Sequence, residues 1–155
     1  MFDLAQHIDK QVDSIESLAA AAPEQRLALL LAGGDGTRLQ EFTTQLTGAP
    51  IPKQYCPLVR GRSLLELTLS RTHYFAPIEN TRVIINQNHL GFAGDQLKAL
   101  PESSTFVQPE NRDTGPGMIF ALMQIARTSP DATIAVFLIN RIFLLHGSSR
   151  SGSSR

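Results

Sequence analysis

Three glycines and two cations in this chain have the types and spacing of a phosphate-binding site. Gly33, Gly34 and Gly36 follow an apolar run in the segment LALLLAGGDGTRL, and Arg38 and Lys53 come after them. Glycine permits positive φ angles and lets the backbone approach a ligand closely, so main-chain amides can surround an anion. Arg38 and Lys53 add positive charge at the same place. The combination predicts a site for a phosphorylated, anionic substrate.

The glycine turn has other interpretations, which the sequence partly excludes. A glycine-rich turn after a strand also occurs for tight packing alone. The chain lacks the G-x-x-x-x-G-K-[ST] string of a Walker loop, and Leu39 stands where a G-x-G-x-x-G dinucleotide fingerprint needs its third glycine. Asp35, inside the turn, either stabilises its own backbone or contacts a metal through water.

The elements that must position this turn alternate between strand and helix patterns. Apolar runs predict strands at 27–32, 82–86, 105–107 and 132–137. Helical spacing predicts helices at 63–74, 90–100 and 116–127, with a capping box at Ser63 and Glu66 and with Thr114 as a cap. This alternation predicts an α/β, Rossmann-like fold, a mostly parallel sheet with helices on both faces. Ligands bind such sheets beyond the carboxyl ends of the strands, where the glycine turn falls.

Three parts are expected along the chain: a helical appendage at 1–23, a nucleotide-binding α/β domain at 24–145 and a disordered tail at 146–155. Residues 3–22 carry apolar side chains at helical spacing. This helix either packs on its own domain or mediates dimerisation, which leaves a homo-oligomer open. The tail, ending in GSSRSGSSR, is polar and of low complexity.

Composition points to a cytoplasmic protein with a small-molecule substrate. Fourteen basic and fourteen acidic residues cancel, which argues against a nucleic-acid polymer or an anionic membrane as partner. The single cysteine, Cys56, excludes an intramolecular disulfide and fits a reducing compartment; we expect it in a partly buried turn without a catalytic role. No apolar run reaches the ~20 residues of a membrane span, and no secretory signal is expected. The four histidines show no metal-ligand spacing.

Two segments resemble the sugar-phosphate nucleotidyltransferases, also called sugar-nucleotide pyrophosphorylases. LAGGDGTRL followed by PKQYCPL is similar to the signature of this family. QPENRDTGPGM, at 108–118, is similar to a segment of the mannose-1-phosphate guanylyltransferases. The resemblance covers about residues 25–137. It implies transfer of a nucleoside monophosphate from GTP to mannose 1-phosphate, with release of pyrophosphate and with Mg²⁺ as cofactor.

The resemblance also implies a role for each matching residue. Arg38 would neutralise the departing pyrophosphate and Lys53 would reach the α-phosphate, the two catalytic assignments. Glu110, Asn111 and Arg112 would belong to the nucleobase pocket, although they could equally form a solvated loop. The full nucleotide-binding set implied by the resemblance is Leu31, Ala32, Gly33, Gly34, Asp35, Gly36, Thr37, Gln108, Glu110, Asn111, Arg112 and Thr114.

The chain departs from the family pattern after the strand at 132–137. The family continues there with Pro-Ser-Asp-His, whose aspartate binds the catalytic magnesium, whereas this chain has Asn140 at that place. An amide offers oxygen without charge, so magnesium binding should be weaker, and no residue is assigned as a metal ligand. The family's domain is longer, and the ending has the look of a foreign or frame-shifted terminus; a natural short protein is the alternative.

Three hypotheses follow from these observations. The first is a sugar-phosphate nucleotidyltransferase. The second is a catalytically inactive nucleotide-binding fragment or interaction module, because the magnesium aspartate and the later catalytic half are missing from the sequence. A dinucleotide-dependent oxidoreductase is the third, and NADH binding would distinguish it.

Overall fold

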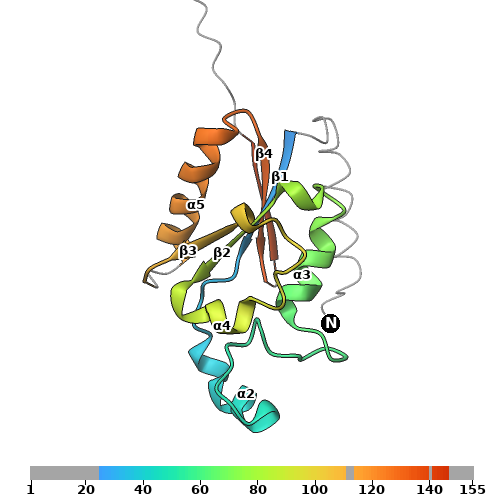
Figure 1. Cartoon of the computed structure of the whole chain (residues 1–155), viewed down its shortest axis with the longest axis vertical. Coiled ribbons are helices and arrows are strands. Elements are labelled where there is room, and N and C mark those ends of the chain that lie inside the picture. Colours follow the sequence, from blue (N-terminus) through green and yellow to red (C-terminus); the bar gives the residue numbers. More distant parts are fainter. Residues whose placement is uncertain (1–24, 111–113, 140, 147–155) are drawn as a thin grey trace, which may run out of the picture.

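The computed structural model describes residues 25–110, 114–139 and 141–146. Its centre is a five-stranded sheet in the order β3-β2-β1-β4-β5 (Figure 1). The strands are β1 (Arg26–Leu31), β2 (Thr81–Asn86), β3 (Thr105–Gln108), β4 (Thr133–Leu138) and β5 (Arg141–His146). The first four are parallel, and β5 pairs antiparallel with β4 at one edge. The expected mostly parallel α/β sheet is confirmed.

The central strand, β1, is apolar along its length because both of its faces are covered. Ala28 and Leu30 belong to a buried cluster on one face of the sheet, and Leu27 and Leu29 to a second cluster on the other. Successive residues of a strand point to opposite faces, which explains the unbroken run of apolar residues. The register places Leu31, at the end of β1, beside Ile84 of β2 and Leu138 of β4.

Helices cover both faces of the sheet, as expected (Figure 1). The covering helices are α3 (Leu64–Thr72), α4 (Leu90–Ala93) and α5 (Thr114–Thr128), whereas α2 (Gln40–Thr47) lies away from the sheet (Figure 1). The 3₁₀ turns are η2 (Thr37–Leu39), η3 (Ile78–Asn80), η4 (Gln87–His89) and η5 (Glu102–Ser104). α3 begins with the predicted capping box: the Glu66 amide donates to Ser63 Oγ at 3.0 Å, and the Ser63 amide donates to Glu66 Oε2 at 2.7 Å.

Several sequence predictions need correction. The helix predicted over 90–100 ends at Ala93 and continues as turns. Gly91 and Gly94 explain this, because each glycine weakens a helix interior by roughly 0.5–1 kcal/mol. Thr114 is the first residue of α5 rather than its cap. The sequence did not predict α2 or β5. The appendage at 1–23 and residues 147–155 lie outside the described residues.

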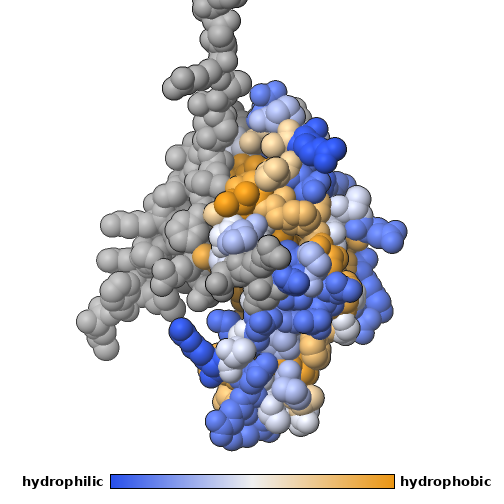
Figure 2. Space-filling model, turned by 90° about the vertical axis from the view of Figure 1, so that its left-hand side faces the viewer, coloured by the Kyte–Doolittle hydropathy of each residue, from blue (hydrophilic) through white to orange (hydrophobic). Residues whose placement is uncertain are grey.

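The outer surface of α5 carries apolar side chains. Ile119, Phe120 and Met123 are exposed, whereas Ala121 and Ile125 of the same helix are buried against the sheet. Figure 2, which views the molecule from the left of Figure 1, shows apolar surface among polar groups on this side. No helix in the described part of the chain is both long and apolar enough for a membrane crossing.

Candidate functional site

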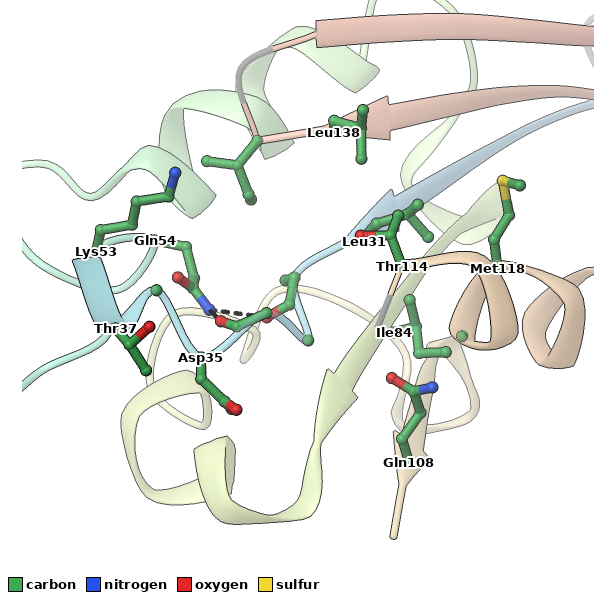
Figure 3. Close-up of a pocket in the computed structure, with 16 residues that line it drawn as sticks. Leu31, Asp35, Thr37, Lys53, Gln54, Ile84, Gln108, Thr114, Met118 and Leu138 are labelled. Carbon is green, nitrogen blue, oxygen red and sulfur yellow. Dashed lines mark hydrogen bonds between the residues drawn. The ribbon is translucent and has the colours of Figure 1, made fainter. Parts of the chain in front are cut away.

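A cavity of about 470 Å³ opens where the parallel strands end (Figure 3). The turn after β1, the end of β3 and the first turn of α5 contribute its walls. The lining residues are Leu31, Ala32, Gly33, Gly34, Asp35, Gly36, Thr37, Lys53, Gln54, Ile84, Gln108, Thr114, Gly117, Met118, Leu138 and Ile139.

The glycine loop, residues 33–36, passes along the cavity with its backbone close to the ligand space. Gly36 has a φ of 62°, a left-handed conformation that glycine adopts without strain. The amides of Gly33, Gly34 and Gly36 donate to no backbone carbonyl of the described residues. Such amides are suited to binding the oxygen atoms of a phosphate chain.

Two residues of the segment after Lys53 hold the glycine loop in place. The Gln54 side chain, which is 3% exposed, donates from Nε2 to the carbonyl oxygens of Ala32, at 3.0 Å, and Gly34. The buried Tyr55 hydroxyl also donates to the Ala32 oxygen, at 2.9 Å. Burial raises the pKa of Tyr55, so this hydroxyl keeps its proton and remains a donor. The two halves of the first resembling segment, the glycine loop and PKQYCPL, are therefore joined by hydrogen bonds.

A third contact with the loop comes from η4. His89 is buried, and its Nε2 lies 3.3 Å from Oδ1 of Asp35. Burial lowers the pKa of His89, and the neighbouring Asp35 carboxylate opposes that effect. The sequence offered two roles for Asp35, a water-mediated metal contact or a bond to its own turn. The structure places its carboxylate beside a histidine 54 positions later in the chain, a contact that the sequence did not predict.

Gln108 lies on the opposite side of the cavity from Lys53 (Figure 3). Its side-chain amide lies against two glycines: a Cβ added at Gly33 would approach its Oε1 to 3.0 Å, and one added at Gly117 would approach its Nε2 to 2.7 Å. Both glycines therefore leave room for this amide. An amide carries two donors and an acceptor, which suits it to bind the edge of a nucleobase.

The structure brings most of the predicted nucleotide-binding residues to one cavity, together with Lys53. Arg38, in η2, and Glu110, after β3, are exposed and do not line it. Asn111, Arg112 and Asn140 lie outside the described residues. Sequence reasoning missed six lining residues, although three of them stood in the quoted segments PKQYCPL and QPENRDTGPGM. The six are Gln54, Ile84, Gly117, Met118, Leu138 and Ile139.

The described residues do not by themselves make a magnesium site. Asp35 is the only carboxylate among the described lining residues, and it faces His89. No group of three histidine, cysteine, aspartate or glutamate side chains gathers in the described part of the chain. Magnesium prefers carboxylate and phosphate oxygens in near-octahedral geometry. We therefore assign it no protein ligand among these residues. Cys56, expected to be partly buried, is fully buried in its turn.

Known proteins are similar to this chain in sequence and fold. The family described as Nucleotidyl transferase matches residues 27–144. The xanthan biosynthesis protein XanB of Xanthomonas campestris pv. campestris (strain B100) is 32% identical over 115 residues, covering 71% of this chain and 23% of XanB. Mannose-1-phosphate guanylyltransferase of Escherichia coli is 29% identical over 118 residues, covering 75% of this chain and 24% of that protein.

A solved structure agrees with these matches. The crystal structure of a protein described as mannose-1-phosphate geranyltransferase from Thermus thermophilus aligns with a TM-score of 0.60 and 25% identity, over 75% of this chain and 32% of that one. The chain spans about a quarter of the length of the curated relatives it matches. With most of its sequence matched and the same fold, this chain belongs to the nucleotidyl transferase family.

Proposed function

We propose that the cavity binds a nucleoside triphosphate and serves transfer of its nucleoside monophosphate to a sugar 1-phosphate, with release of pyrophosphate. The observation that carries this proposal is the glycine loop with its available amides, which lines the same cavity as Lys53. GTP and mannose 1-phosphate are the favoured substrates. The 108–118 segment and the relative named mannose-1-phosphate guanylyltransferase support that choice.

The chemistry asks mainly for positioning and charge neutralisation. An oxygen of the sugar phosphate attacks the α-phosphorus in line, and the bond from that phosphorus to pyrophosphate breaks. The amides of Gly33, Gly34 and Gly36 hold the phosphate chain, and the Lys53 ammonium binds the α-phosphate. Arg38 is exposed beside the loop and is proposed to meet the departing pyrophosphate. The separation of Lys53 and Gln108 in the cavity suits a nucleotide whose base lies far from its phosphates (Figure 3).

Nucleotide binding without transfer is the second candidate. The side chains available as metal ligands favour this candidate. The described residues supply no cluster of such ligands, and the sequence has Asn140 where the family pattern has an aspartate. Magnesium stays a prediction from the family resemblance.

Calorimetric titration of the purified chain with GTP, ATP, CTP and UTP tests the proposal. We expect saturable binding with GTP preferred, and NADH should not compete. Pyrophosphate release in the presence of mannose 1-phosphate and Mg²⁺ then separates the two candidates. GTP binding together with pyrophosphate release that is abolished in Arg38→Ala supports the transferase. GTP binding without pyrophosphate release supports nucleotide binding alone. A chain that binds no triphosphate contradicts both.

Gly117→Ala should reduce the preference for GTP over ATP about five-fold. The new Cβ would come within 2.7 Å of Gln108 Nε2, so the side-chain amide has to leave its place beside the base. A misplaced hydrogen-bonding pair costs on the order of 1 kcal/mol of discrimination. Titration with both nucleotides measures the change. Gly115→Ala is the matched control in the same helix turn, because a Cβ there meets nothing within 4 Å; an equal effect of both variants would contradict the role of Gln108.

A further inference from the structure

The glycine loop contains a negative charge at a place proposed to bind negative charge. Asp35 lies between Gly34 and Gly36, and its side chain is 45% exposed. Two like charges repel each other, and they do so more strongly at a protein surface than in bulk water. Figure 3 shows that the Asp35 side chain points away from Lys53 and Gln54. A loop that binds phosphate therefore needs its carboxylate kept on the opposite side.

His89 is built to hold that carboxylate. Its Nε2 lies 3.3 Å from Asp35 Oδ1, and its Nδ1 lies 3.4 Å from the Tyr55 hydroxyl oxygen. The imidazole also packs edge-on against the Tyr55 ring, with centroids 5.4 Å apart. Tyr55 in turn donates to Ala32, the residue before the loop. A carboxylate can only accept, so Nε2 must carry the hydrogen that it shares with Asp35.

We propose that His89 is a positioning residue, which keeps the Asp35 carboxylate off the phosphate-binding side of the glycine loop. The imidazole is fixed by packing and burial, so it offers Asp35 a donor at a defined place. This inference rests on the proposed binding of a triphosphate. It adds a residue, far from the loop in sequence, whose effect on affinity should grow with the number of phosphates.

The test measures binding of GTP and of guanosine to the full chain. His89→Leu should weaken GTP binding about ten-fold and guanosine binding less than about two-fold. Adding Asp35→Asn to His89→Leu should restore GTP binding, because no carboxylate remains to repel the phosphates. His89→Gln, which keeps a donor near Nε2, should retain most of the affinity. His73→Leu, at an exposed histidine after α3, is the matched control.

The possible results separate this inference from the proposed function. GTP binding that is lost in His89→Leu and restored by Asp35→Asn supports the inference, since a purely structural loss would not be reversed by removing a charge. The inference is overturned, while the proposed function stands, by any one of three results: His89→Leu keeps the wild-type GTP affinity, its guanosine affinity falls as much as its GTP affinity, or the added Asp35→Asn fails to restore GTP binding. A wild-type chain that binds no GTP overturns the proposed function itself. If His89→Leu does not fold, His89→Asn replaces it, because its shorter amide cannot reach Asp35 as Nε2 does.

Discussion

Replacing Lys53 with methionine should weaken GTP binding about 30-fold while the fold stays intact. Among the described residues that line the cavity, Lys53 is the only cation. A hydrogen bond to a charged group contributes about 2 kcal/mol, which corresponds to this change in affinity. Methionine keeps the apolar stem beside Gly36, where an added Cβ would lie 3.4 Å from Lys53 Cγ. The variant therefore removes the charge and little of the packing.

Calorimetric titration with GTP, GDP, GMP and guanosine measures this prediction. The loss should be smallest for guanosine, because the ammonium acts on phosphate rather than on the base or ribose. Lys98→Met is the control: this lysine is 75% exposed, pairs with Asp95 at 2.7 Å and lies outside the cavity. The prediction is contradicted if Lys53→Met keeps the wild-type GTP affinity, or if its affinity for guanosine falls as much as its affinity for GTP. Either result would mean that the phosphates bind elsewhere.

The sheet could be predicted from the sequence because local patterns determine it. A strand buried on both faces must be apolar along its length, and each of the four parallel strands lies within two residues of its predicted bounds. β5 was missed because the apolar residues at 134–145 form one nearly continuous run, and composition does not show where a strand turns back on itself. α2 was missed because its sequence, QEFTTQLT, has only eight residues, three of them threonines, which lower its helix propensity.

The site could be predicted only in part. The glycine loop and Lys53 were found because a phosphate site imposes residue types that are visible locally. The support of the loop was not, because Gln54 and His89 reach it from 20 and 54 positions away, measured from Gly34 and Asp35. Such contacts depend on how the strands pair and on which turns meet at their ends. Tertiary packing also decides that Arg38, two residues beyond Gly36, does not line the cavity.

Gln54→Leu should lower GTP affinity about 30-fold and the free energy of unfolding by about 2 kcal/mol. The substitution keeps a side chain of similar size but removes the Nε2 group that donates to the carbonyl oxygens of Ala32 and Gly34. Each of the two intramolecular hydrogen bonds that are lost contributes about 1 kcal/mol. The Ala32 oxygen keeps the Tyr55 hydroxyl, whereas the Gly34 oxygen loses this donor inside the loop itself. The loop amides should then lose the fixed positions that phosphate binding requires.

Gln96→Leu distinguishes loss of loop position from general loss of stability. Gln96 also donates from its side chain to a backbone carbonyl, that of Tyr55 at 3.0 Å, but it does not line the cavity. Both variants should unfold at lower denaturant concentration, and only Gln54→Leu should lose most of its GTP affinity. Equal losses of affinity would mean that stability alone controls binding. If Gln54→Leu binds GTP as the wild type does, the phosphate chain does not rest on the loop that Gln54 supports.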